Sequence, residues 1–226
     1  MTEHSDALNA LLKIVQETKV PIGELQAKLE HLLACDRTPE ELRRWRRASG
    51  PLKKVCDEIL PVSRTFRFFN VTNGALAFPL DNKVPDCWWY REGKEPIGIE
   101  VTVAQGRARH LMARELEAEG IGRGFLALQD TATDEEAEAA AESKRTMYTK
   151  EQAREAMRRA LLHCMSQKNE PKYEGMILVI ETDMTPIRGA DYESLVPELK
   201  EIADSTPFSA IYAIGKGEKL LGLKLK

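Results

Sequence analysis

Leucine and valine side chains recur at helical spacing through the first sixty residues. Apolar positions within residues 8–15 and 21–33 predict two amphipathic helices. Residues 38–41, Thr-Pro-Glu-Glu, form the pattern of a capping box and predict the start of a third helix, which Gly50-Pro51 ends. A short fourth helix is expected up to Leu60. We therefore expect a helical lead-in over residues 1–60, packed on a main domain over 61–226.

From Phe66 onward the pattern changes to that of β-strands. Residues 66–72 and 75–80, with a turn at Asn73-Gly74, predict a hairpin or an irregular β segment. Residues 86–92 and 96–104 predict two further strands, joined at Gly93-Lys94. The second of these strands alternates between two faces: Ile97, Ile99, Val101 and Val103 on one, and Gly98, Glu100, Thr102 and Ala104 on the other.

Helical and strand patterns alternate through the rest of the chain. A helix over 107–119, with Gly120 as its C-cap, precedes a predicted strand at 125–129. The polar stretch 130–146 is expected to be a loop or a solvated helix. The remaining predicted elements are a helix over 150–167, a strand at 176–180, a helix near 191–203, a strand at 208–214 and a short strand around 220–225. This order predicts an α/β layered fold.

Composition limits the class of protein. The chain has 226 residues, 42% of them hydrophobic and 31% charged, which suits one domain with a sizeable core. It has no apolar run of membrane-spanning length, so no membrane partner is expected. Its first residues lack the pattern of a secretory signal, and a cytoplasmic location is expected. The net charge of −3 conceals segregation: six cations lie between Arg43 and Lys54, and six acids between Asp130 and Thr146.

The soft metal ligands are scattered along the chain. The four cysteines form no CxxC pair, and the four histidines form no HExxH or HxxxH pattern. Zinc sites need several such ligands at short spacing, so a structural zinc site is not expected. Cysteines without an export signal are typical of buried thiols in a reducing compartment.

The most informative chemistry is a pair of carboxylates at two predicted strands. Asp86 follows Val84-Pro85, and Glu100 follows after thirteen intervening residues. If residues 93–95 form a three-residue loop, Asp86 opposes Thr102 and lies diagonally beside Glu100 on one face. A two-residue loop would place the two acids on opposite faces. Hard divalent cations take oxygen ligands from one or two carboxylates, so an odd-length loop predicts a magnesium site.

These residues resemble the motif of the PD-(D/E)XK nuclease superfamily. The resemblance rests on Pro85-Asp86, on Glu100-Val101-Thr102, and on the helix and strand that follow, and it covers roughly residues 51–182 in element order. It implies a restriction-endonuclease-like mixed central sheet flanked by helices, and Mg²⁺- or Mn²⁺-dependent hydrolysis of DNA or RNA. It also implies that Asp86 and Glu100 bind the metal, with Glu58 or Asp57 completing the site from a preceding helix.

One position departs from the family pattern. Thr102 stands where the superfamily has a lysine that helps to activate water. Gln105 and Arg107, with Arg109 and His110, begin the next predicted helix, and they are candidates to supply the missing function. The alternative is that the site is inactive and the fold serves as a binding scaffold.

A local basic patch could contact phosphates, with Trp45 available to stack on a base. Its cations are Arg43, Arg44, Arg46, Arg47, Lys53 and Lys54. The alternative is a solvated helix face paired with Glu40 and Glu41. A third interpretation of the whole chain is a small interaction module that self-associates through the helices of residues 5–60, and a homodimer is possible in either case.

Overall fold

A mixed β-sheet lies at the centre of the molecule in a computed structural model, which describes residues 2–81, 83–122, 124, 128–143, 148–184, 191–216 and 221–226. Among these residues seven strands lie side by side in chain order. They are β1 (Val20–Pro21), β2 (Ala75–Ala77), β3 (Cys87–Tyr90), β4 (Ile97–Val103), β5 (Ile177–Thr182), β6 (Ala210–Gly215) and β7 (Gly222–Lys224). Strands β4, β5 and β6 are parallel, and every other neighbouring pair is antiparallel.

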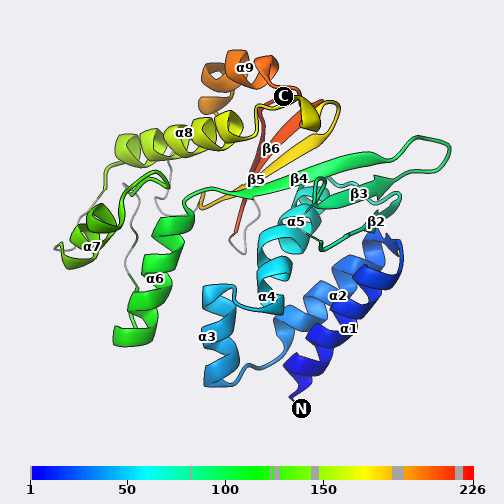
Figure 1. The fold of residues 1–226 in the computed structure, drawn as a ribbon, viewed down its shortest axis with the longest axis horizontal. Coiled ribbons are helices and arrows are strands. Elements are labelled where there is room, and N and C mark those ends of the chain that lie inside the picture. The colour runs from blue at the N-terminus through cyan, green and yellow to red at the C-terminus, as the bar shows by residue number, and fades with distance from the viewer. Residues whose placement is uncertain are drawn as a thin grey trace.

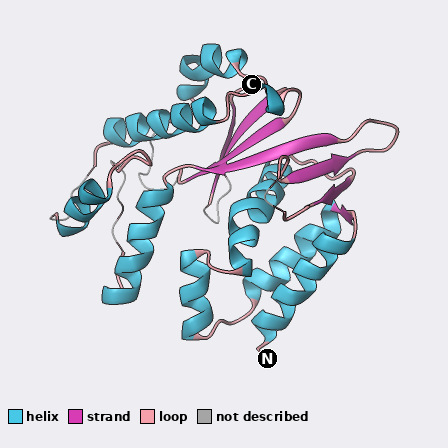
Figure 2. Ribbon diagram, viewed as in Figure 1, coloured by secondary structure: helices cyan, strands magenta, loops and turns pink. Residues whose placement is uncertain are grey.

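Helices cover both faces of this sheet (Figures 1 and 2). The helical segments are α1 (Glu3–Glu17), α2 (Ile22–Ala34), α3 (Pro39–Arg47), α4 (Pro51–Lys54), the π-helical turn η1 (Val55–Ile59), α5 (Leu60–Phe68), α6 (Gly106–Glu119), α7 (Asp134–Glu142), α8 (Lys150–Gln167), the 3-10 turn η2 (Pro171–Tyr173) and α9 (Leu195–Ser205). The protein is therefore a mixed α/β protein, as the sequence predicts.

The strand alternation divides the apolar side chains into two layers. Ile99 and Val101 of β4 pack with Val179 of β5 and with the buried faces of α1, α2 and α5. Leu178 and Ile180, which alternate with Val179, pack with α8 and α9 on the opposite face. Because Glu100 pairs with Leu178 in register, it lies on the α8 side of the sheet.

The N-terminal helices share the core of the sheet. Strand β1 lies between α1 and α2 and pairs with β2, which makes the lead-in part of the sheet (Figure 1). Leu25 and Leu29 of α2 belong to the same buried cluster as Ile99. The helical stretch that begins at Pro51 continues across residue 60 to Phe68.

The strand predicted at residues 66–72 is wrong, because the helix of α5 extends to Phe68. Ile59, Val62 and Phe66 follow one another at helical spacing, and all three are buried in the core under β4. This burial outweighs the strand preference of the aromatic run. The β segment of this region is limited to Ala75–Ala77, which pairs with β1 and β3.

Most other predicted elements are confirmed. Helix α6 ends at Gly120, whose φ of 72° suits a glycine C-cap, and α8 has the predicted bounds. The acidic stretch contains α7, which opens with a capping box at Thr133. Of the strand predicted at 125–129, residues 125–127 lie outside the described residues, and the last two are not in a strand. None of the described helices is long and apolar enough to cross a bilayer.

Candidate functional site

A widened helical turn carries two of the candidate acids. In η1 the Leu60 amide bonds to the Val55 carbonyl, five residues back. Pro61 follows directly, and since proline has no amide hydrogen, a regular helical bond from this position is absent in any case. Asp57 and Glu58 lie on this turn, while Val55 and Ile59 are buried beneath it. Turns of this kind occur frequently at functional sites.

The pairing of β3 with β4 brings Asp86 next to Glu100. Cys87 opposes Ile99 and Trp88 opposes Gly98, so continuing the register by one step places Asp86 opposite Glu100. The predicted register, with Asp86 opposite Thr102, is wrong by two residues. The cause is the position of the connection between the strands: Trp89 opposes Ile97, so the connection is centred on Gly93 and not on Lys94. The predicted parity is right, because a shift of two residues keeps both acids on one face.

Close packing fixes the position of Asp86. A Cβ atom added at Gly98 would lie 3.1 Å from Pro85 Cγ, so the absence of a side chain at Gly98 lets Pro85 pack against β4. The Asp86 carboxylate then accepts a hydrogen bond of 2.8 Å from the Val101 amide. This bond ties the carboxylate to β4 one residue beyond Glu100.

The candidate acids meet in one pocket of about 360 Å³. We call it the carboxylate pocket. Its lining residues come from α4 and η1, from the segment before β3, from β4, and from the end of α8: Lys53, Lys54, Asp57, Glu58, Asp86, Glu100, Val101, Thr102, Val103 and Lys168. The structure thus brings together Asp86, Glu100, Thr102 and Glu58, as the sequence suggests.

Two carboxylates of the pocket are each held by a lysine through one oxygen. Lys168 Nζ donates to Glu100 Oε1 at 2.6 Å, and Lys54 Nζ donates to Glu58 Oε1 at 2.5 Å. The second oxygen of each group, Oε2, is buried and has no hydrogen-bond partner among the described residues. Buried acceptors without a partner are rare in native proteins, and an unseen ion is one standard reason for them.

The electrostatics of the pocket favour a cation. Burial raises the pKa of Glu58, of Asp86 and of Glu100 above their usual values. The charge of Asp86 raises the pKa of the two glutamates further. A divalent cation bound in this pocket would favour the ionised form of all three carboxylates and would thereby offset the effect of their burial.

Asp57 differs from its neighbour Glu58. Burial would raise its pKa, but hydrogen bonds from Lys53 at 2.6 Å and from Arg109 at 2.7 Å outweigh that effect, and the pKa is lowered. Both of its oxygens are therefore engaged by cations. Of the two acids that the sequence offers for completing the site, Glu58 is the one with a free oxygen.

A lysine that sequence reasoning missed lies in the pocket. Lys168 directly follows α8, 68 residues after its partner Glu100, and its side chain is 25% exposed. Burial alone would lower its pKa, but the bond and the charge of Glu100 raise it, so Lys168 carries a positive charge at neutral pH. Only the packing of α8 against the sheet could have identified this residue, because no sequence motif joins it to β4.

The other candidates at the start of α6 do not line the pocket. Gln105, in the left-handed conformation with φ of 60°, donates its backbone N–H to Asp130 at 2.8 Å, and the backbone N–H of Arg107 donates to the same carboxylate at 3.0 Å. The Arg107 guanidinium pairs with Asp134 at 2.8 Å. The Asp130 carboxylate therefore already occupies the backbone amides at the start of α6.

The basic patch divides into two groups in the structure. Lys53 and Lys54 lie at the carboxylate pocket. Arg43 and Arg44 pair with Glu40, Arg47 pairs with Glu117 of α6, and Arg46 is half-buried on α3. Trp45 lies under the guanidinium of Arg37, 4.3 Å from the ring centroid, and packs against the core. The arrangement of the arginines matches the alternative of an ion-paired helix face more closely than that of a stacking platform.

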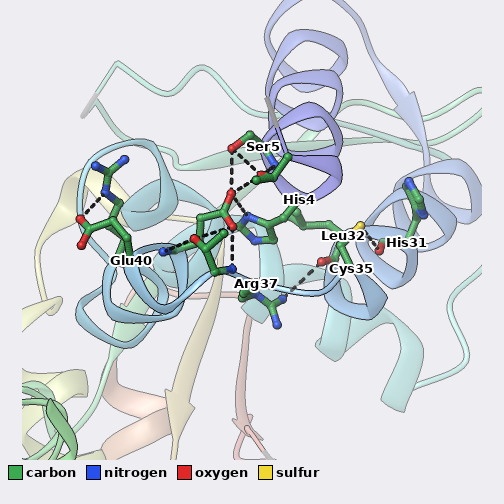
Figure 3. Close-up of polar contacts among 11 residues, drawn as sticks. His4, Ser5, His31, Leu32, Cys35, Arg37 and Glu40 are labelled. Atoms are coloured by element: carbon green, nitrogen blue, oxygen red, sulfur yellow. Dashed lines mark hydrogen bonds and ion pairs between the residues drawn. The ribbon is translucent and has the colours of Figure 1, made fainter.

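A second polar cluster lies where α1 meets α3, and we call it the Glu41 cluster. Figure 3 shows His4 and Ser5 at the start of α1 facing the segment of Arg37 and Glu40. Glu41 accepts hydrogen bonds from Thr2, from Ser5 at 2.9 Å, and from the amide and hydroxyl of Thr38, each at 2.9 Å. These bonds, that of Thr2 first, lower the pKa of Glu41 to about 2.

The sequence matches no protein-family model, and comparisons with curated proteins and with solved structures found no match.

Proposed function

We propose that this protein is a metal-dependent phosphodiesterase of the PD-(D/E)XK type, acting on DNA or RNA. Asp86, Glu100 and Glu58 would hold Mg²⁺ or Mn²⁺ after moving closer together, because their ligand atoms do not all lie within 4.8 Å of one another in the metal-free arrangement. Lys168 would supply the positive charge of the family's lysine, at whose position this chain has Thr102. The observation that carries the proposal is the pair of buried, unpartnered oxygens, Glu58 Oε2 and Glu100 Oε2, in one pocket with Asp86. Carboxylate oxygens are the ligands that both cations prefer.

The element order supports a restriction-endonuclease-like sheet. An antiparallel pair, β3 and β4, carries the two motif acids, and the chain returns through helices to β5, which is parallel to β4. The acid from the preceding helix, Glu58, lies on η1 at the same pocket. The superfamily resemblance calls for each of these placements.

The chain's own residues have distinct roles in this proposal. A bound divalent cation would lower the pKa of a water molecule and neutralise charge on the scissile phosphate. Lys168, held by Glu100 and positively charged, would donate to a phosphate oxygen on which charge develops. Lys53 is 69% exposed, and we assign it to an incoming phosphate at the rim.

Lys168 thus acts as a positioned ammonium in this scheme. Its raised pKa makes it a weak proton acceptor at neutral pH, so it serves as a hydrogen-bond donor. Thr102 lines the same pocket, and its uncharged hydroxyl cannot supply this charge. The positive charge of the family motif would therefore come from a helix end rather than from the strand.

The test is a cleavage screen over single- and double-stranded DNA and RNA with Mg²⁺ and Mn²⁺. The wild-type chain should cleave at least one substrate, and Glu100→Ala should abolish the cleavage. The matched control is Glu95→Ala, at an exposed acid in the connection between β3 and β4, which should cleave as the wild type does.

Two outcomes would overturn the proposal. Salt-sensitive binding of nucleic acid without cleavage would favour a non-catalytic binding protein with the same fold. Cleavage that persists in Glu100→Ala would place the activity outside the carboxylate pocket.

A further inference from the structure

Three different metal-binding side chains meet where α1 begins and α2 ends. One ligand atom each of Glu3, His31 and Cys35 lies within 4.8 Å of the other two, the only such group among the residues that the structure describes. Helices α1 and α2 lie side by side and run in opposite directions, which brings Glu3 to the end of α2 (Figure 1). His31 and Cys35 come from one helical turn, four residues apart, as Figure 3 shows.

We propose that Glu3, His31 and Cys35 form a binding site for a borderline transition-metal ion, Zn²⁺ in the first instance. The donor set of thiolate, imidazole and carboxylate is that of zinc sites, and it differs from the all-oxygen set of the carboxylate pocket. No residue is shared between the two sites.

The exposure of the three side chains suits a half-open site. Cys35 is 6% exposed and held within the core, whereas Glu3 and His31 are exposed and have room to rotate. Zinc–ligand bonds of about 2.0–2.3 Å require the ligand atoms to approach more closely than in the metal-free arrangement. The two exposed side chains can make this movement while the buried sulfur stays in place.

A fourth ligand is close at hand. Asp6 lies one turn after Glu3 on α1, and it lines a pocket of about 490 Å³ together with Glu3 and His31. Tetrahedral zinc needs four ligands, and either Asp6 or a water molecule in this pocket would complete the set. Lys28 lines the same pocket and would repel the cation, which limits the affinity.

The state of the thiol fits a site that a cation would complete. Cys35 Sγ donates to the His31 carbonyl at 3.2 Å, so the sulfur is protonated in the metal-free protein. Burial raises the pKa of this thiol, and the charge of Glu3 raises it further. A dication would reverse both effects, because a coordinating thiol is deprotonated outright.

The test is a titration of the full-length protein, reduced and stripped of metal with a chelator, with Co²⁺ followed by Zn²⁺. We expect a thiolate-to-cobalt charge-transfer band in the near ultraviolet that saturates at one thiolate-bound ion per chain, and loss of that band when Zn²⁺ displaces the cobalt. Cys35→Ser should abolish the band, and Cys56→Ser, at a half-buried cysteine outside the cluster, should keep it.

Two exposed positions keep the test valid if Cys35→Ser does not fold. His31→Gln and Glu3→Gln should each weaken Zn²⁺ binding by at least the ~10- to 100-fold that even an outer-shell partner contributes. The experiment is repeated in Glu100→Ala, which removes an acid of the carboxylate pocket, and the cobalt band should persist there. A spectrum without the thiolate band, or Zn²⁺ binding unchanged in His31→Gln and Glu3→Gln, would overturn the proposal.

Discussion

The carboxylate pocket and the Glu41 cluster both hold acids away from water, but the pKa values of these acids shift in opposite directions. The Glu41 side chain is 12% exposed and accepts hydrogen bonds from three residues, so its pKa falls to about 2. The Glu100 side chain is 5% exposed and has one partner, Lys168, so burial raises its pKa. An acid supplied with donors stabilises the fold in its charged form, whereas an acid left with an open oxygen remains available to a ligand.

The origin of the donors explains the difference. Two of the bonds to Glu41 come from Thr38, three residues before it in a capping box, and the others come from the start of α1. Glu58 comes from η1, Asp86 from the segment before β3 and Glu100 from β4, and the charge of Asp86 acts on both glutamates. Local sequence thus completes the first cluster, while in the second cluster each glutamate has a lysine on one oxygen only.

The largest effect is expected from replacing Lys168, the lysine that is hydrogen-bonded to Glu100. We expect Lys168→Met to lower kcat for cleavage by roughly 10²- to 10⁴-fold, with a smaller change in KM, because it removes the donor assigned to the reacting phosphate. The matched control is Lys94→Met, at an exposed lysine in the connection between β3 and β4. Full activity in Lys168→Met would remove this lysine from the mechanism.

The next effect concerns stability and a cation. At neutral pH, Asp86→Asn should unfold in urea at the same concentration as the wild type or at a higher one, because it removes a buried charge that opposes Glu58 and Glu100. Mg²⁺ or Mn²⁺ at 100 times its Kd should stabilise the wild type by about 2.7 kcal/mol and the variant far less. Equal stabilisation of both proteins would place the cation elsewhere.

The same acids set the sign of a pH effect. A raised folded-state pKa means that, as the pH rises, the folded state keeps its protons to a higher pH than the unfolded state does. The contribution of these three acids is therefore most favourable at low pH, and it is lost as the pH rises from the usual 3.8–4.5 through their raised values. In Asp86→Asn this loss should be smaller, as urea unfolding between pH 4 and pH 7 would measure.

The smallest effect reverses that sign in the Glu41 cluster. The usual pKa of 4.5 falls to about 2, so the contribution of Glu41 is present above pH 4.5 and lost as the pH falls towards 2. Glu41→Gln should be less stable than the wild type at pH 7, and the difference should shrink as the pH approaches 2. Urea unfolding at both pH values measures it. A constant difference would show that packing, and not charge, is responsible.

The limits of sequence reasoning follow the same division between local and distant contacts. Capping and periodicity predicted α3, α6 and α8 because their signals lie within a few residues. The motif also named Asp86 and Glu100, and parity placed them on one face. The register failed by two residues because the connection is centred on Gly93 instead of Lys94, which alternation along the strands does not reveal. Helix α5 was mistaken for a strand because only the core shows why Phe66 is buried. The role of Lys168 could not be predicted, because it depends on where α8, distant in sequence from β4, ends in space.

The widened turn at residues 55–59 accommodates one residue more than a regular helical turn, because the Leu60 amide bonds to the Val55 carbonyl, five residues back. Leu52 before the turn and Val62 and Phe66 after it are all buried, so the helical stretch keeps one face on the core on both sides of the turn. Asp57 and Glu58 lie on the turn and line the carboxylate pocket. Deleting one residue of the turn would restore a regular helix, and it would displace these two acids from the pocket while the buried side chains keep the helix on the core.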